Sequence, residues 1–405
     1  MAGERGILRH RRRAEDGLRG LVGRPGGRGE KEGAVMKVIA IGGAGAMGRM
    51  AVRDLAAAET VTELTIADYN LEAAQALAAE LGPKCRAVKA DADDHSGLVE
   101  LIRGHDIALG TAGPFYKYEA KMARAAIEAG AHYVSICDDY DAAEEVLKLD
   151  QAAKEAGVTA VTGVGWTPGI TNVLARKAAD QLDEVDEIAT SWGCHASDTV
   201  GKAVTLHYLH AVTGMIPSYI DGRITYIPAG SGLEKIRFPE PVGAINVFHA
   251  GHPEPITIPR YINCRTVTLK GGLVDTYLVR LCNALVKLRL TDTMRKKDLV
   301  GGFFNRILPY LEDVGRPPEP CSACRVDVTG RKDGRWTHIV YGAAAHMDAL
   351  TGLPASVAVQ LIGEGKVEAK GVMGPEACLP PDEFIARLKE KGIRFYKDDA
   401  MTEPL

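Results

Sequence analysis

The sequence predicts an α/β protein with a doubly wound parallel sheet near the N-terminus, followed by an α+β domain whose sheet is mainly antiparallel. Three observations carry this prediction. Residues 36–48 have the pattern of a strand, a glycine-rich turn and a helix. Strands and helices then alternate strictly to about residue 165, and from about residue 185 short strands follow one another without regular crossover helices.

The stretch MKVIAIGGAGAMG, residues 36–48, has the order that a dinucleotide-binding turn requires. Val38–Ile41 is a short apolar run, as in a strand buried on both faces. The glycines at 43, 45 and 48 have the spacing G-x-G-x-x-G, which permits a tight turn and close approach of a pyrophosphate to a helix start. We therefore expect a Rossmann domain with cofactor contacts from Gly43, Gly45, Ala46, Met47 and Gly48.

The next predicted strand, 63–67, ends in Asp68, which is twenty residues after Gly48. A carboxylate at this place binds the adenosine ribose hydroxyls. The alternative is that Asp68 caps the helix that begins near Leu71. A carboxylate would repel a 2′-phosphate, and neither Arg nor Lys follows before Lys84, so the sequence favours NAD over NADP.

The remaining elements of the N-terminal half follow from apolar periodicity and turn residues. Ser96 is the expected cap of the third helix, and Gly130 and Gly157 end the later ones. Six parallel strands with helical crossovers result. The predicted helices are 47–58, 71–81, 96–102, 117–129 and 141–156, and the further strands are 85–90, 106–110, 132–136 and 158–161.

Ligands of such sheets bind beyond the carboxyl ends of the strands, and unusual residues follow these ends here. Asp91 follows the third strand, the turn Thr111-Ala112-Gly113-Pro114-Phe115 the fourth, and Cys137-Asp138-Asp139 the fifth. Gly165, Trp166 and Thr167 follow the sixth, before a helix predicted over 168–179 with Pro168 in its first turn. We expect Asp91, Thr111, Ala112, Gly113, Pro114, Phe115, Gly165 and Trp166 to contact the cofactor.

The second half is divided by prolines into short strands. A hairpin is expected around Lys332-Asp333-Gly334. The predicted domains are 36–165 for the nucleotide, 166–345 for substrate and dimerisation, and 346–405 as a C-terminal segment. The predicted strands are 187–192, 223–227, 234–238, 244–248, 265–269, 325–329, 337–343 and 393–396, and the helices are 273–288, 302–311, 355–362 and 381–389.

Together these motifs resemble the saccharopine dehydrogenase-like reductases. The resemblance rests on Gly43–Gly48, on the turn at 111–115, on GWTPGITN at 165–172 and on the closing pattern TGLPAS at 351–356 with Pro375-Glu376. It covers about 36–396 and is thin between 191 and 335. One departure is Thr167, which stands where the true saccharopine reductases carry Asp, so their substrate contacts do not transfer there.

The resemblance implies an NAD(P)-dependent oxidoreductase that acts on a carbon–nitrogen bond of an amino acid or imine, and the chain's length is similar to the lysine 6-dehydrogenase-like branch. It also implies that the C-terminal segment returns to pack on the nucleotide domain and that the sheet domain forms a homodimer. A non-catalytic NAD(H)-binding module that senses redox state is the alternative function.

Three residues are candidates for acid–base catalysis. Asp138 lies at the carboxyl end of a strand, although it is equally suited to cap the following helix. His252 and Glu254 lie in the polar loop HAGHPEPITIPR, where histidine's pKa suits proton transfer near neutral pH, but a solvated loop is the commoner explanation. Cys137 is not expected to be a nucleophile, because no convincing histidine partner follows it.

The substrate contacts are less well specified. Arg260 and Arg265 could hold a carboxylate in bidentate fashion, although surface charges are the simpler explanation. Tyr118 is a further candidate. The helix start at Thr167 is another, because the free N–H groups of a helix N-terminus would bind a carboxylate. His195 is a weaker one.

Composition limits the class of protein. The 405 residues allow two domains, and a net charge of −4 gives no general attraction to nucleic acid or anionic membranes. Residues 1–35 hold nine Lys or Arg against five Asp or Glu with little apolar periodicity, which predicts a disordered basic tail. Eight cysteines without a secretory signal indicate a cytoplasmic protein. Cys321 and Cys324 have no second ligand pair at suitable spacing, so no metal site is predicted.

Overall fold

The computed structural model describes residues 35–198, 202–274 and 322–405, together with 284–285, 288–291, 293, 295–296 and 299–303. The predicted tail at 1–35 and the predicted helices at 273–288 and 302–311 lie wholly or largely outside the described residues. Among those residues, no helix combines the length and the apolar character that crossing a membrane requires.

The N-terminal half forms a parallel sheet of seven strands in the order β15-β6-β5-β4-β1-β2-β3. The doubly wound sheet is confirmed, but the sequence predicted only six of its strands. The seventh, β15, comes from the C-terminal segment and pairs with β6 beyond the last predicted strand. The strands are β1 (Met36–Ile41), β2 (Val61–Asp68), β3 (Cys85–Lys89), β4 (Ile107–Gly110), β5 (His132–Ser135), β6 (Thr159–Val161) and β15 (Gly371–Met373).

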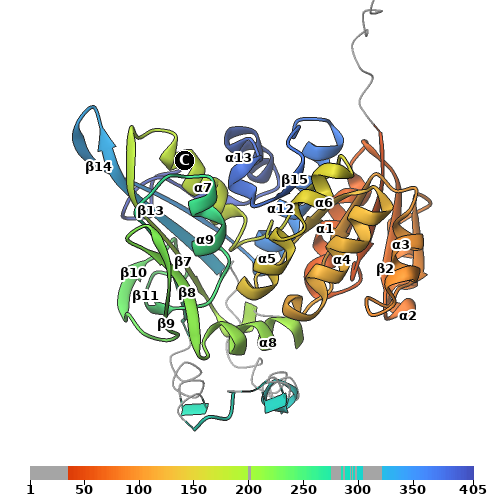
Figure 1. Cartoon of the computed structure of the whole chain (residues 1–405), viewed down its shortest axis with the longest axis horizontal. Helices are drawn as coiled ribbons and strands as arrows, with labels where there is room; N and C mark the ends of the chain where they lie inside the picture. Colours follow the sequence, from red (N-terminus) through yellow and green to blue (C-terminus); the bar gives the residue numbers. More distant parts are fainter. Residues whose placement is uncertain are drawn as a thin grey trace, which may run out of the picture. The chain divides into compact units, whose positions relative to one another are not determined.

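Helices cover both faces of this sheet (Figure 1). On one face α1 contacts α2 and α12, and on the other α4 contacts α3 and α5. The strands between them are largely buried, as both-sided coverage requires, except for the edge strand β3, whose residues are half-buried or exposed. The helices are α1 (Ala46–Ala57), α2 (Leu71–Leu81), α3 (His95–Ile102), α4 (Phe115–Ala129), α5 (Tyr140–Leu147), α6 (Asp150–Glu155) and α12 (Met347–Gly363).

Two local predictions in this domain are wrong. Asp94, rather than Ser96, caps α3, because the Asp94 carboxylate accepts from the Gly97 amide at 3.1 Å and the Ser96 hydroxyl donates to the same oxygen. The single helix predicted over 141–156 is divided into α5 and α6, which are interrupted at residues 148–149. The predicted stops at Gly130 and Gly157 are confirmed by φ angles of 75° and 69°.

The second half forms a sheet of nine strands. It is mainly antiparallel, as predicted, except that β7 and β12 run parallel. Its strands are β7 (Glu184–Cys194), β8 (Met215–Ile220), β9 (Arg223–Pro228), β10 (Glu234–Arg237), β11 (Ala244–His249), β12 (Thr266–Leu273), β13 (Ser322–Lys332), β14 (Arg335–Ala345) and β16 (Arg394–Tyr396). The predicted hairpin is confirmed: β13 and β14 meet at Asp333 and Gly334, whose φ angles of 50° and 73° suit a tight hairpin turn.

Among the described residues, the helices that accompany this sheet include α7 (Ile170–Ala179), α8 (Lys202–Ala211), α9 (Glu254–Thr257) and α13 (Pro381–Glu390). The sequence did not predict α8, α9 or strand β8. The helix predicted over 168–179 starts at Ile170, because Gly169 has a φ of 128° and is the N-cap. In Figure 1, α7, α9 and α8 lie between the second sheet and the nucleotide domain.

The C-terminal segment contributes to both sheets, with β15 in the first and β16 in the second. Its helix α12 packs along α1, and the Asp54 side chain of α1 accepts hydrogen bonds from Ser356 at 2.6 Å and Gln360 at 3.1 Å. Gly352 permits this close approach, because a Cβ there would lie 2.7 Å from the Met50 Cβ and 2.8 Å from the Ala51 nitrogen.

Replacing Gly352 with alanine therefore tests the packing of α12 on α1. Alanine is the better helix former by ~1 kcal/mol, so propensity alone would stabilise the variant. We expect instead a loss of ~1–3 kcal/mol in the free energy of unfolding, because overpacking forces the helices apart. Urea unfolding measures this loss, with Ala349→Gly as the reference for helix propensity. An unfolding midpoint at or above that of the wild type would contradict the packing.

Candidate functional site

A cavity of about 590 Å³ lies where the carboxyl ends of the parallel strands face the second half of the chain. This volume is within the ~300–1,000 Å³ that small-molecule and cofactor sites occupy. One end is lined by residues that follow β1, β2 and β3, and the other by α8, by Trp192 and by the loop before α9. The place is the one that doubly wound sheets use for ligands.

The glycine turn fits a dinucleotide. Gly42 has a φ of 82°, and a Cβ there would lie 2.6 Å from the Ala112 nitrogen. At Gly48 a Cβ would lie 2.6 Å from the Gly42 carbonyl oxygen, so α1 approaches the turn only because residue 48 has no side chain. Gly45, Ala46 and Met47 line the cavity at the start of α1, where first-turn N–H groups lack helical partners. Gly43 packs against Ala40 behind the turn.

Asp68 and Asp91 line the end of the cavity expected to hold the adenosine. The Asp68 carboxylate accepts from the Ala44 amide at 3.0 Å and from the Asn70 amide at 2.9 Å, so it is fixed against the turn. Asp68 is not the cap of α2, because Asn70 is the cap and accepts from the Ala73 amide at 3.1 Å. Tyr69 adds an exposed ring beside Asp68.

The other predicted cofactor contacts also line the cavity: Thr111, Ala112, Gly113, Pro114, Phe115, Gly165 and Trp166. Tyr118 and Thr167, predicted for the substrate, line it too. An aromatic wall continues from Trp166 to Trp192 and Tyr208, with ring centroids 6.0 and 6.3 Å apart. All three of these aromatic residues line the cavity.

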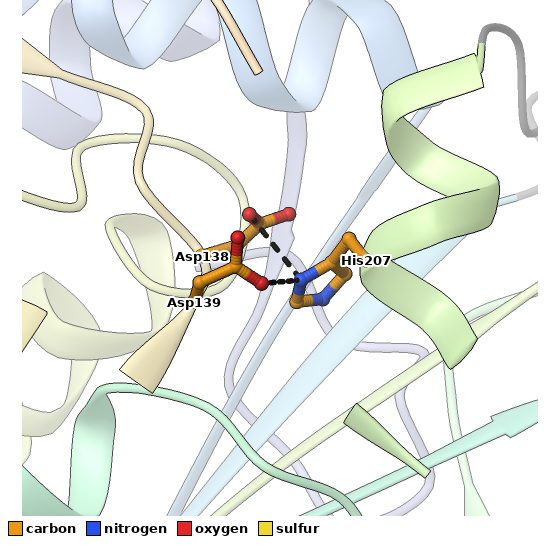
Figure 2. Close-up of side chains that lie close together, drawn as sticks. All are labelled: Asp138, Asp139 and His207. Carbon is orange, nitrogen blue, oxygen red and sulfur yellow. Dashed lines mark hydrogen bonds and ion pairs between the residues drawn. The ribbon is translucent and has the colours of Figure 1, made fainter. Parts of the chain in front are cut away.

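Two carboxylates and an imidazole from residues that line the cavity lie close together (Figure 2). The His207 Nδ1 atom lies 2.8 Å from the Asp139 Oδ1 atom and 3.3 Å from the Asp138 Oδ1 atom. Asp139 also accepts from the Tyr116 amide at 2.9 Å. The carboxylates follow β5 and the imidazole comes from α8, so the two halves of the chain build this cluster together.

Burial and charge shift the pKa values of all three groups. Burial, assisted by the charge of Asp139, raises the pKa of Asp138 to about 7. Burial also disfavours ionisation of Asp139, but the hydrogen bond from His207 and the charge of that ring lower its pKa overall. Burial would lower the pKa of His207, yet the charges of Asp138 and Asp139 raise it to about 9.

Each of these three residues also has an atom that could ligate a metal ion, and the three atoms lie within 4.8 Å of one another. We interpret them as a hydrogen-bonded ion pair and not as a metal centre. The 2.8 Å distance between Nδ1 and the Asp139 oxygen is that of a direct charge-assisted hydrogen bond, in which Nδ1 carries the proton. A nitrogen that binds a metal ion must be deprotonated.

The two other predicted catalytic residues lie behind this cluster. His252 lines the cavity, and its Nε2 atom lies 3.3 Å from the Nε2 atom of His207. Glu254 is wholly buried, and its Oε1 atom accepts from the hydroxyl groups of Thr167 at 2.6 Å and Thr171 at 2.9 Å. Burial raises the pKa of Glu254 to about 7 despite these donors. The loop is therefore buried, against the expectation of a solvated one.

Three substrate predictions do not agree with the structure. Arg265 is exposed and forms ion pairs with Asp186 at 2.8 Å and Asp221 at 2.7 Å. Arg260 is exposed as well, and neither arginine lines the cavity. His195 also lies outside the lining.

The start of α7 does not present free N–H groups to a carboxylate. Its amides are engaged, because Gly169 donates to the Asn172 side chain at 3.0 Å and Ile170 donates to the Gly165 carbonyl at 2.9 Å. Cys137 is wholly buried, and burial raises the pKa of its thiol well above the usual value, which disfavours a role as nucleophile.

His207 is the principal residue that sequence reasoning missed. The helix that carries it, α8, was not predicted, and no spacing links residue 207 to residues 138 and 139. The pair His207 and His210, three residues apart on one helix face, was the available signal.

Two family models together match most of the chain. Residues 38–161 match the family model of the saccharopine dehydrogenase NADP binding domain, and residues 165–393 match that of the saccharopine dehydrogenase C-terminal domain. The chain is 23% identical over 399 residues to a carboxyaminopropylagmatine dehydrogenase from Synechocystis sp., covering 89% of this chain and 98% of the relative. It is 23% identical over 347 residues to a carboxynorspermidine synthase from Vibrio alginolyticus, covering 77% and 83%.

Among solved structures, an apo saccharopine dehydrogenase (L-Glu forming) from Saccharomyces cerevisiae is similar with a TM-score of 0.64. The similarity covers 90% of this chain and 100% of that one at 16% identity, and it shows a shared fold.

The raised pKa of His207 predicts a pH-dependent stability. The pKa of His207 is about 9 in the folded protein, against an ordinary value of 6.5. Its contribution to the free energy of unfolding is therefore complete below pH 6.5 and is lost as the pH rises through 9. Relative to His207→Gln, the wild type should lose on the order of 1–3 kcal/mol over this interval. Urea unfolding of both proteins from pH 6 to 10 measures the difference. Parallel curves would show that His207 has no raised pKa.

Proposed function

Because this chain belongs to the saccharopine dehydrogenase family, we propose that it is a nicotinamide-dependent oxidoreductase that acts on the carbon–nitrogen bond of an amino acid or its imine. The observation that carries the proposal is the joining, in one cavity, of the glycine turn with the Asp138, Asp139 and His207 cluster. A module that only senses the nucleotide would have no use for a buried acid–base cluster, which favours the enzyme over that alternative.

When bound, the nicotinamide ring would supply hydride chemistry at the substrate carbon. The residues of the turn at 111–115, with Gly165 and Trp166, would hold its ribose and ring, because they line the same cavity as the glycine turn. The aromatic wall formed by Trp166, Trp192 and Tyr208 would keep water from the reacting carbon.

Asp138 is the group we assign to the substrate nitrogen. Its Oδ1 atom is buried and faces His207, while the side chain is 29% exposed and lines the cavity, so Oδ2 is the oxygen available to substrate. A carboxyl group with a pKa of about 7 can accept the proton of a substrate ammonium and can return it. Asp139, held by His207 and the Tyr116 amide, stays ionised and fixes the imidazole.

We propose NAD as the cofactor. Two carboxylates, Asp68 and Asp91, line the adenosine end, and both would repel a 2′-phosphate. Asp68 is held by two backbone amides, so it is not free to turn away from the ribose. The names of the matching family model and of some relatives refer to NADP. The affinities for NAD and NADP should therefore be measured directly.

Replacing Asp138 with asparagine tests the catalytic assignment. Asparagine keeps the size of the side chain but cannot take a proton, so we expect turnover to fall by ~10²–10⁴-fold while nucleotide binding stays intact. Wild-type and variant enzymes would be assayed with NAD⁺ and NADH against lysine, saccharopine, carboxynorspermidine and carboxyaminopropylagmatine, together with their aldehyde and amine precursors, by NADH absorbance.

Asp141→Asn is the matched control, because Asp141 lies in the first turn of α5, three residues after Asp138, and does not line the cavity. It should keep turnover near that of the wild type. In the oxidative direction the wild-type rate should rise with pH through about 7, as Asp138 ionises. No turnover across the panel by a protein that binds the nucleotide would contradict the proposed enzyme.

Replacing Asp68 with serine tests the cofactor. The substitution removes the charge that repels a 2′-phosphate, while Lys89, whose Nζ atom lies 5.6 Å from the centre of the Tyr69 ring, remains as an attractive cation. We expect the ratio of NAD to NADP affinity to fall by at least about tenfold. Calorimetric titration with both nucleotides measures it. A ratio equal to that of the wild type would remove Asp68 from cofactor selection.

A further inference from the structure

A row of titratable groups leads from the cavity into the protein interior. It starts at the Asp139 carboxylate, which lies 2.8 Å from the His207 Nδ1 atom. The Nε2 atom on the other side of that ring lies 3.3 Å from the His252 Nε2 atom, and the two rings are nearly perpendicular. The Nδ1 atom of His252 then lies 3.9 Å from the Oε2 atom of Glu254.

The last two atoms in the row, Nδ1 of His252 and Oε2 of Glu254, have no hydrogen-bond partner among the described residues. The two side chains are 3% and 0% exposed. Leaving a buried polar atom unpaired costs ~1–3 kcal/mol. A small rotation of the Glu254 carboxyl group about its anchored Oε1 atom would bring the two atoms together and satisfy both.

The hydrogen bonds also fix where the protons lie. His207 donates from Nδ1 to Asp139, so when the ring is charged its Nε2–H donates to the Nε2 atom of His252. His252 must then be neutral and must carry its own proton on Nδ1. Burial and the charge of His207 lower the pKa of His252 well below its usual value, which agrees with a neutral ring. The proton on Nδ1 faces Glu254.

We propose that His207, His252 and Glu254 form a proton relay in which the buried Glu254 carboxylate stores a proton taken from the cavity cluster. This proposal rests on the proposed function, because the relay serves the acid–base step at Asp138. His252 and Glu254 are positioning residues in it, since they act through His207 and do not touch the substrate nitrogen.

The transfer is balanced and involves no change of oxidation state. The N–H bond at Nε2 of His207 breaks and an N–H bond forms at Nε2 of His252. At the same time the N–H bond at Nδ1 of His252 breaks and an O–H bond forms at Oε2 of Glu254. The positive charge of His207 and the negative charge of Glu254 both disappear, while His252 stays neutral and changes tautomer.

The position of this proton controls Asp138. The charge of His207 lowers the pKa of Asp138, against the effects of burial and of Asp139. When the proton moves to Glu254, His207 becomes neutral and Asp138 becomes a stronger base for the substrate ammonium. When the proton returns, Asp138 becomes the stronger acid and gives its proton back to the substrate nitrogen.

The groups around the relay are consistent with this exchange. The Thr167 and Thr171 hydroxyls hold one oxygen of Glu254, and the charge of the buried Glu376 raises its pKa further. The backbone of Thr167 and the charge of Asp139 face His252 and raise its pKa, against the larger effects of burial and of His207. The centre of the Trp192 ring lies 6.0 Å from that of the His252 ring, and both residues line the cavity.

Glu254→Gln tests the relay, with Glu376→Gln as the matched control. Glutamine retains an oxygen for the two threonine hydroxyls but cannot store a proton. Glu376 is also a wholly buried carboxylate with a raised pKa, and it bonds to Asn172 at 2.8 Å instead of facing His252. The first readout needs no substrate: long-range ¹H–¹⁵N NMR of the imidazole nitrogens, assigned with His207→Gln and His252→Gln.

We expect wild-type His252 to be neutral with its proton on Nδ1 and His207 to be doubly protonated at pH 7. Glu254→Gln should lower the titration midpoint of His207, because it removes a charge that raises the pKa of this ring, and it should shift the resonance of the His252 Nδ1 atom, which loses the carboxylate it faces. Glu376→Gln should leave both unchanged. A His252 proton on Nε2 in the wild type, or equal shifts in both variants, would overturn the relay.

The second readout is kinetic. Glu254→Gln should lower kcat by ~10²-fold with little change in KM, and it should make the dependence of kcat on the fraction of D₂O linear where the wild type is curved. The control should keep the wild-type curvature, because it leaves the proton acceptor Glu254 in place. An unchanged kcat in Glu254→Gln would overturn the relay, whereas the expected NMR result without turnover on any substrate would reject the proposed function alone.

Discussion

The structure of the site depends on one buried hydrogen bond, between the Asp139 carboxylate at the end of β5 and the His207 ring on α8. It joins the parallel sheet to the second half of the chain at a point where Asp139 is 0% exposed. Buried charges persist only when they are paired and hydrogen-bonded, so the position of each partner is fixed by the other. Asp138 is adjacent in sequence and has its basicity set by the same imidazole.

Several carboxyl groups in this region are buried with hydroxyl or amide donors instead of cations. Glu119 accepts from Tyr133, Ser135 and Thr162 at 2.6–2.9 Å, and burial raises its pKa to about 7, as it does for Glu254. Neutral donors stabilise a carboxylate less than an arginine would, so these groups remain close to titration near neutral pH. A site surrounded by such groups can exchange protons without large changes of structure.

The C-terminal segment completes the nucleotide domain from far along the chain. Strand β15 extends the parallel sheet beside β6, and α12 packs on α1, the helix whose first turn faces the cofactor end of the cavity. Met347 and Thr351, at the start of α12, line the same cavity. A segment that begins near residue 346 therefore supports both the glycine turn and the site.

The sequence by itself determined the glycine turn, the six parallel strands with their helical crossovers, the hairpin at Asp333 and the residues expected around the cofactor, because each depends on neighbours within about thirty residues. Short-range periodicity and turn residues carry that information. It also placed Asp138, His252 and Glu254 among the candidates for proton transfer, without relating them to one another. Only the tertiary structure decided that His207 joins them, that Arg260 and Arg265 lie away from the cavity and that β15 is the seventh strand. These outcomes depend on contacts between segments 70 to 210 residues apart, and a local pattern carries no information on which distant side chain will fill a buried position.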